Sequence, residues 1–157
     1  MVDIIELFEQ LVKIPSPSLG EKNLSDKILE FTYNNKINAC YDNYNNVIIR
    51  IPATDSAKKP LLLSSHMDVV GSSAPVEIRY SADKKFIETD KTRTLGADDK
   101  AGVAVCLSMA EFLANNPDIS HGGLEIVLTR DEETGMTGIN NIQFNDLESE
   151  NVLVLDS

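Results

Sequence analysis

Apolar residues near the start of the chain recur at helical spacing. Ile4, Leu7, Phe8 and Leu11 fall on one face of a helix predicted over 3–13, and this helix should end before the prolines of the IPSPSLGE turn. A second amphipathic pattern follows that turn. It predicts another helix through about residue 34, with Ser25 or an earlier polar residue near its start.

Alternating and continuous apolar runs predict the strands. The segment KINACYDNYNNVIIRIPA alternates enough for two strands joined at an Asn-rich turn around Asn45, and VEIRYSADKKFIETD alternates on either side of a turn at 82–84. Three continuous apolar runs, at 61–66, 124–130 and 151–157, predict fully buried strands.

A mostly apolar helix is predicted over about 99–114, buried against the sheet. Strands that alternate with helices indicate an α/β fold, here a three-layer sandwich with a mostly parallel central sheet. With 157 residues, of which 42% are hydrophobic, the chain can form one compact domain with a core.

Charge and cysteine content narrow the classes of partner. The 25 acidic and 14 basic residues give a formal net charge of -11, which disfavours nucleic acid and anionic membranes as partners. Cys40 and Cys106 lack CxxC spacing, so free thiols are expected. The N-terminus does not have the pattern of a signal peptide and no apolar run approaches 18 residues, so we expect a cytoplasmic protein.

Residues that can bind metal follow each of the three buried strands. His66 and Asp68 close the first, the acidic run 131–133 follows the second, and Asp156 ends the third. In α/β sheets, ligands bind at the carboxyl ends of parallel strands. Asp98, in the turn that opens the apolar helix, should reach the same edge.

Each of these residues also has a simpler structural interpretation. His66 could be a core histidine, Asp98 a helix cap, Asp156 a frayed chain end, and the acidic run a solvated turn. Taken together, however, so many carboxylates at one edge would repel one another unless a cation compensates. A carboxylate-rich set with one imidazole suits Zn²⁺, Co²⁺ or Mn²⁺.

Four segments carry a family resemblance. SSHMDVVG, TLGADDKAGVA, HGGLEIVLTRDEETGMTG and NVLVLDS resemble, in this order, the motifs of the co-catalytic dizinc metallopeptidase family, which includes aminopeptidases of the peptidase T type, carboxypeptidases and deacylases. The resemblance is greatest to the tripeptide aminopeptidases. It implies a hydrolase that acts on short peptides with two divalent metal ions, for which zinc is the favoured metal.

The resemblance also implies a role for each candidate residue. His66 and Asp156 become ligands of one metal, Glu133 a ligand of the other, and Asp98 a bridge between the two. Asp68 becomes the acid that supports His66, and Glu132 the general base that acts on a water activated by both metals. Finally, the peptide bond that follows Asp98 is expected to be cis.

The chain departs from the family pattern in its length. Family members continue into a lid or dimerisation domain and return with a last metal-binding histidine, so this chain is expected to be the N-terminal portion, 1–157, of the catalytic domain. His121 precedes a strand, at the wrong end to replace that histidine. We therefore expect little activity from this chain alone and apolar surface that favours self-association. In the complete protein, a homodimer through the lid domain is expected.

Two alternatives stay open beside the tripeptidase. One is an aminoacyl-histidine dipeptidase, or a deacylase or carboxypeptidase on the same scaffold. The other is a metal-binding module without catalysis. Metal analysis of the wild type against Asp98→Asn separates the module from the enzymes.

Overall fold

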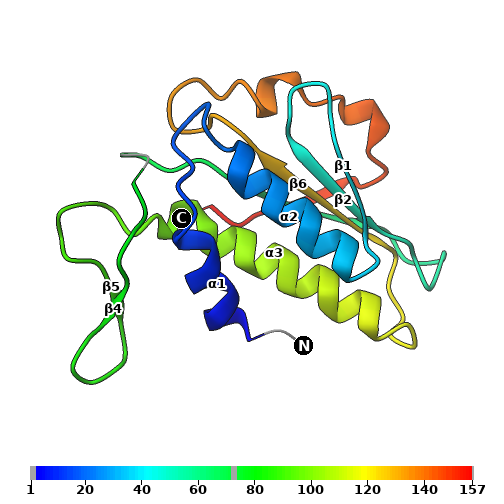
Figure 1. Ribbon diagram of the computed structural model, residues 1–157. Helices are drawn as coiled ribbons and strands as arrows, with labels where there is room; N and C mark the ends of the chain where they lie inside the picture. The colour runs from blue at the N-terminus through cyan, green and yellow to red at the C-terminus, as the bar shows by residue number, and fades with distance from the viewer. Residues whose placement is uncertain (1–2, 72–73, 157) are drawn as a thin grey trace.

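A five-stranded sheet forms the centre of the molecule, described by a computed structural model for residues 3–71 and 74–156 (Figure 1). The order of its strands is β1-β2-β6-β3-β7. Their bounds are Asn38–Tyr41 (β1), Val47–Ile51 (β2), Leu61–His66 (β3), Leu124–Thr129 (β6) and Asn151–Val154 (β7). Only β2 runs against the others, since it pairs antiparallel with both of its neighbours while β6, β3 and β7 pair in parallel. The mostly parallel α/β sheet expected from the sequence is confirmed.

Three helices cover one face of this sheet: α1 (Ile4–Val12), α2 (Lys22–Asn34) and α3 (Ala97–Asn115). Their apolar faces and alternate residues of the strands form the main core, which includes Leu24, Ile28, Leu107 and Ile126. α1 begins after Asp3, whose carboxylate accepts a hydrogen bond from the backbone of Ile5 at 2.8 Å. None of the helices in the described ranges has the length and apolar character needed to cross a membrane.

The opposite face of the sheet is covered differently. Two short 3₁₀ turns, η1 (Ile139–Asn141) and η2 (Phe144–Asp146), lie over it. Their neighbours Ile142 and Leu147 belong to a small second core with Ile48, Leu62 and Val127 of the sheet. Within the described residues, this layer is therefore thinner than the helical one.

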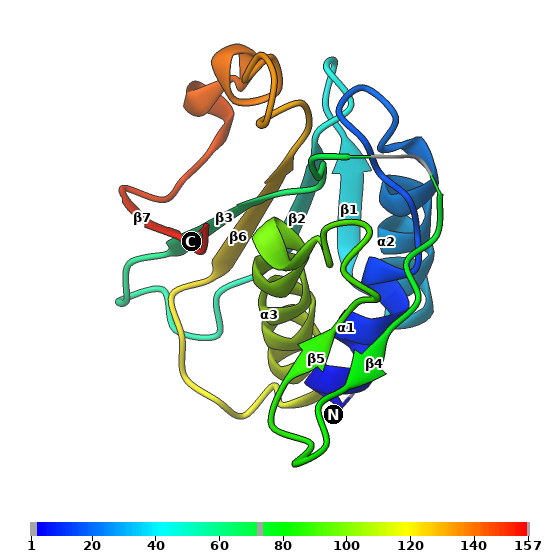
Figure 2. The same ribbon diagram turned by 90° about the vertical axis from the view of Figure 1, so that its left-hand side faces the viewer.

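The predicted hairpin forms a small ribbon beside the helices. β4 (Arg79–Tyr80) and β5 (Ile87–Glu88) pair antiparallel, and Figure 2 shows them next to α1. The Tyr80 hydroxyl donates a hydrogen bond to the Glu9 carboxylate of α1. This contact ties the hairpin to the helical layer.

Two sequence predictions need correction. The last strand was expected to be buried, but all four residues of β7 are exposed, because β7 is an edge strand with one neighbour, β3. The apolar helix was expected to start near 99, yet helical turns begin at Ala97, and Asp98 and Asp99 have non-helical backbone angles that kink it. Regular helix follows from Lys100.

Candidate metal centre

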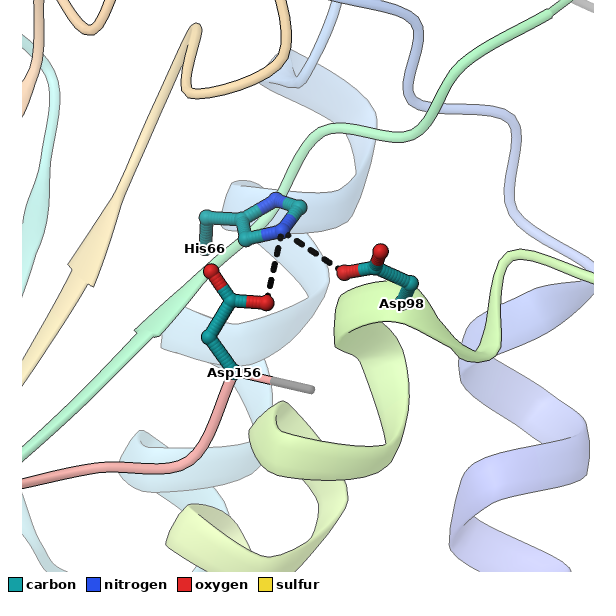
Figure 3. A group of neighbouring side chains, drawn as sticks. All are labelled: His66, Asp98 and Asp156. Carbon is teal, nitrogen blue, oxygen red and sulfur yellow. Dashed lines mark hydrogen bonds and ion pairs between the residues drawn. The ribbon is translucent and has the colours of Figure 1, made fainter.

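Three segments bring a histidine and two carboxylates together at the carboxyl end of β3. His66 is the last residue of β3, Asp98 lies in the kinked first turn of α3, and Asp156 follows β7. The Nε2 atom of His66 lies 3.1 Å from Asp98 Oδ1 and 3.9 Å from Asp156 Oδ1. Figure 3 shows the imidazole facing both carboxylates. One ligand atom from each side chain lies within 4.8 Å of the other two.

His66 is almost fully buried, with 3% of its side chain exposed, while the Asp98 carboxylate is open to solvent. Burial lowers the pKa of His66, but the carboxylates of Asp68 and Asp98 outweigh it and raise this pKa to about 9. On the far side of the ring, Nδ1 lies 3.4 Å from Asp68 Oδ1 and makes no hydrogen bond of good geometry in the described structure. The imidazole is thus held between acids on both of its nitrogens.

Asp68 joins this histidine to the acidic turn after β6. Its carboxylate is fully buried and accepts hydrogen bonds from the backbone N–H groups of Glu132, at 2.9 Å, and Glu133, at 3.1 Å. The hydroxyl of Ser18 donates a third, at 2.7 Å. Burial raises the pKa of Asp68, yet His66 and these donors together lower it to about 2.

Asp99 has a different role from Asp98. Its buried carboxylate accepts hydrogen bonds from the Ser65 hydroxyl at 2.5 Å, the backbone N–H of His66 at 3.2 Å and the backbone N–H of Gly102 at 3.1 Å. Burial raises the pKa of Asp99 above its usual range. The capping bond that the simpler interpretation assigned to Asp98 is therefore made by Asp99, whereas Asp98 faces His66. The peptide bond between them is cis, as the family resemblance implied.

The two glutamates lie beside the cluster of three. Burial, followed by the negative charge of Asp98, raises the pKa of Glu133. Glu133 does not belong to the group of His66, Asp98 and Asp156, which is the metal-binding group found among the described residues. The acidic turn is therefore adjacent to the site and oriented by Asp68, with its second carboxylate near Asp98.

The group of three fits a divalent metal ion. Four ligand atoms at about 2.0 Å from Zn²⁺ stand roughly 3.3 Å apart in tetrahedral geometry. The distances of 3.1 and 3.9 Å from His66 Nε2 bracket this value. One imidazole with carboxylates is also a donor set that Zn²⁺, Co²⁺ and Mn²⁺ accept.

His121 lies where the sequence placed it, next to the amino end of β6 and away from the metal-binding cluster. Its Nδ1 accepts a hydrogen bond from the backbone of Gly123 at 3.1 Å, and its own N–H donates to the Thr54 hydroxyl at 2.9 Å. His121 therefore stabilises the loop that leads into β6.

Sequence reasoning missed three residues that shape the site. Ser18 bonds to Asp68, Glu21 to the backbone of Asp131 in the acidic turn, and Asn46 to the backbone of Arg130 just before that turn. Each lies far from its partner along the chain, so periodicity and spacing carry no signal of these contacts. Burial to 0–4% exposure marks the polar residues Glu21 and Asn46, whereas the half-buried Ser18 is found through its bond to Asp68.

The mostly parallel α/β sheet with a histidine and carboxylates at its carboxyl edge defines a hydrolase scaffold of the metallopeptidase class. A family model described as peptidase family M28 matches residues 46–155, which is more than half of the chain. The chain belongs to this family. The expectation of a co-catalytic metallopeptidase is thereby confirmed.

Individual relatives agree with this assignment. The chain is 31% identical over 162 residues to the cytosol non-specific dipeptidase of Escherichia coli, covering 97% of this chain and 32% of the relative. Aminopeptidase PepT of Bacillus cereus superposes with a TM-score of 0.90 at 25% identity, covering 98% and 43%. The aminoacylhistidine dipeptidase of Vibrio alginolyticus gives 0.83 at 30% identity, covering 98% and 32%. The chain thus spans a third to less than half of each relative.

Proposed function

We propose that this chain is the N-terminal, metal-binding portion of the catalytic domain of a metal-dependent exopeptidase, an aminopeptidase that acts on short peptides such as tripeptides. The observation that carries the proposal is the convergence of His66, Asp98 and Asp156 on one point, beside a glutamate pair anchored on the same Asp68 that supports His66. Three separate segments of the chain contribute to this convergence.

In this proposal two divalent ions, most favourably zinc, bind at the carboxyl edge of the sheet. His66, Asp98 and Asp156 hold one of them, and Asp98 together with Glu133 holds the other. When bound, such ions lower the pKa of a water molecule and polarise a peptide carbonyl. The raised pKa of Glu133, partly caused by the charge of Asp98, supports a shared cation between these two carboxylates.

The protein's own residues then handle the proton. Glu132 accepts a proton from the attacking water and passes it to the leaving amine, which is the role of a general base followed by a general acid. Asp68 faces the His66 ring with its Oδ1 atom 3.4 Å from Nδ1, and it holds Glu132 through the backbone N–H of that residue. One buried carboxylate therefore orients both a ligand and the base.

The choice of short peptides as substrates is supported by the names of the relatives. PepT is an aminopeptidase, and its match to this chain has the higher TM-score of the two structures compared above. The dipeptidase of Escherichia coli matches 97% of the chain and supports dipeptide hydrolysis as the second candidate. Deacylase or carboxypeptidase activity on the same scaffold is the third. The word "cytosol" in that relative's name and the two free thiols support a cytoplasmic location.

A zinc titration of the 157-residue chain tests the metal site. Wild type should bind Zn²⁺ stoichiometrically, and Asp98→Asn should weaken binding by more than ~100-fold, because the substitution removes a ligand and a charge while keeping the shape of the side chain. Asp118→Asn, at an exposed position after α3, is the matched control and should bind as wild type does. No stoichiometric binding by wild type, or equal binding by Asp98→Asn, would favour a module without a metal centre.

Activity of the same polypeptide is a separate prediction. The second metal has only Asp98 and Glu133 as protein ligands in the described chain, too few for tight binding. We therefore expect zinc-loaded 157-residue protein to hydrolyse tripeptides at a rate close to background in an amine-release assay. Appreciable hydrolysis by the homogeneous protein, abolished by Glu132→Gln, would contradict this expectation and show that these ligands suffice.

A further inference from the structure

The turn between α1 and α2 is hydrogen-bonded to the segments that follow two of the candidate ligands, His66 and Asp98. The backbone N–H of Val69 donates to Ser16 O at 3.0 Å, and Pro17 forms a parallel bridge with Val69. At the start of the turn, the buried ammonium of Lys100 donates to Ile14 O at 2.6 Å. The turn is therefore fixed relative to both β3 and α3 before its side chains are considered.

Glu21 attaches the other end of this turn to the segment after β6. Its Oε1 atom accepts two hydrogen bonds, one from the backbone N–H of Leu19 at 2.8 Å and one from the backbone N–H of Asp131 at 2.9 Å. Its second oxygen lies 3.6 Å from Arg130 Nε, and its side chain is 4% exposed. Glu21 is thus hydrogen-bonded both to its own turn and to Asp131, the first residue of the acidic turn. These bonds fix the position of Ser18 relative to the acidic turn.

The Ser18 side chain contacts Asp68 directly from this turn. The Asp68 carboxylate has two contacts on each oxygen: Oδ1 faces Glu132 N–H and His66 Nδ1, and Oδ2 faces Glu133 N–H and the Ser18 hydroxyl. At 2.7 Å, the bond from Ser18 is the shortest of the four. The hydroxyl thus completes the set of contacts that fixes the plane of the Asp68 carboxylate.

We propose that Ser18 is a positioning residue for the metal centre: its hydroxyl fixes the rotation of the Asp68 carboxylate, which in turn holds the His66 ring and the Glu132–Glu133 backbone in one arrangement. The inference rests on the proposed function, since it assigns Ser18 to the same site. Without the hydroxyl, Oδ2 keeps only the Glu133 N–H, and rotation of the carboxylate loosens the histidine and the glutamate turn together.

Paired variants at two serines of the same turn test the proposal in the 157-residue chain. Ser18→Ala removes the hydroxyl and Ser18→Thr keeps it. Ser18→Val matches the shape of threonine without the hydroxyl and serves as a second variant if alanine compromises folding. Ser16→Ala is the matched control, because the Ser16 hydroxyl is fully buried but has no hydrogen-bond partner in the described structure.

Zinc affinity and the visible spectrum of bound Co²⁺ form the first readout. Ser18→Ala and Ser18→Val should bind Zn²⁺ about 10-fold more weakly, within the range measured when groups behind metal ligands are removed, and should alter the Co²⁺ absorption bands. Ser18→Thr and Ser16→Ala should match wild type in both. Wild-type affinity and spectrum in folded Ser18→Ala and Ser18→Val would overturn the proposal, as would equal weakening by Ser18→Thr.

Amide hydrogen exchange without metal forms the second readout. The Glu132 and Glu133 amides donate to Asp68, so they should exchange faster in Ser18→Ala than in wild type, while amides in the middle of β6 keep their protection. Unchanged exchange at both amides would overturn the link through Asp68. If wild type binds no zinc, the proposed function fails, whereas the exchange data still decide whether Ser18 orders this turn.

Discussion

Asp98 and Asp99 are adjacent in the chain yet have opposite surroundings. The Asp98 side chain is 54% exposed and faces His66, whereas Asp99 is buried and bonds to Ser65 and Gly102. Their backbone angles, with ψ of 106° at Asp98 and 35° at Asp99, send the two side chains in different directions. The pair can therefore divide two tasks, one acid offered to a cation and the other used to start the regular helix.

Cys106 provides a test of how tightly α3 is buried. It is fully inaccessible, and burial, followed by the charge of Asp99, raises the pKa of its thiol to about 12. At pH 8 the native protein should therefore react with an alkylating reagent at the exposed Cys40 and not at Cys106, as read by peptide mass spectrometry. The Cys40→Ser variant should stay unlabelled until it unfolds. Labelling of Cys106 at the rate of Cys40 would show that α3 opens readily.

The same pKa predicts how stability responds to alkali. An acid whose pKa is higher in the folded state stabilises the fold below its ordinary pKa, here 9.0, and this contribution is lost as the pH rises from there toward about 12. Wild type should thus lose free energy of unfolding relative to Cys106→Ala above pH 9, by at most about 1.4 kcal/mol per pH unit. Urea unfolding at pH 8, 9 and 10 measures the difference. Parallel profiles for the two proteins would contradict the assigned pKa.

At the scale of single residues, the sequence predicts which side chains meet but not how their partners are arranged. His66, Asp98 and Asp156 could be grouped because strand ends of a parallel sheet share an edge. Ser18 could not, because its partner Asp68 lies 50 positions away and a turn serine has many possible partners. Such contacts depend on how the α1–α2 turn packs, and local pattern does not specify this packing.

The segment that follows β6 is built around buried polar groups. Asn46, which is fully buried, accepts a hydrogen bond from the backbone of Arg130 at 3.2 Å and donates one to Gly138 O at 3.1 Å. Asp131 accepts hydrogen bonds from the hydroxyls of Thr134 and Thr137. These bonds fix both ends of the loop 130–138, and they thereby fix the backbone conformation of the two glutamates within it.

Gly138→Ala tests whether this closure matters. A Cβ at this position would lie 2.4 Å from Asn46 Oδ1 and 2.5 Å from Arg130 O, and the second of these is backbone that cannot move without shifting the loop. We expect a loss of about 1–3 kcal/mol in unfolding free energy, the usual cost of overpacking, together with weaker zinc binding. Urea unfolding and zinc titration measure both. A variant with wild-type stability and affinity would show that the loop adapts freely.

Individual elements were largely predictable because most are continuous apolar or amphipathic patterns. β3 forms over 61–66 as expected, and the strands around the Asn45 turn pair as predicted. β7 was misjudged, since NVLVL has the same apolar character as β6. Whether such a run becomes a central or an edge strand depends on its neighbours in space, and the composition of the run is the same in both cases.

The two faces and the two edges of the sheet are unequal across the whole molecule. Helices bury one face, 3₁₀ turns lie over the other, and β7 forms an edge with Val152, Leu153 and Val154 exposed by 54%, 51% and 60%. An edge strand with apolar side chains and unpaired backbone groups can add a strand from another chain. The net charge of -11 opposes such contact at low ionic strength.

Self-association of the 157-residue protein should therefore depend on both salt and the β7 edge. We expect the weight-average mass in sedimentation equilibrium to rise with protein concentration, and more steeply at high salt, where the repulsion is screened. Leu153→Lys places a charge on the edge and should keep the protein monomeric. Thr92→Lys, in the exposed loop after β5, adds the same single positive charge away from the edge and should self-associate as wild type does. A wild type that stays monomeric at high salt would contradict the prediction.

The edge position of β7 would also limit how long the candidate metal centre retains an ion. β7 pairs with β3 through only four residues, and the Asp156 that follows it contributes one of the three clustered ligand atoms. Whenever this strand detaches, the site loses a ligand, so the apparent dissociation constant for metal is the intrinsic one divided by the fraction of molecules with β7 docked. The rate of metal release should therefore follow the rate at which β7 detaches from β3. Conversely, a bound ion should stabilise the pairing of β7 with β3, because it links Asp156 to His66 and Asp98.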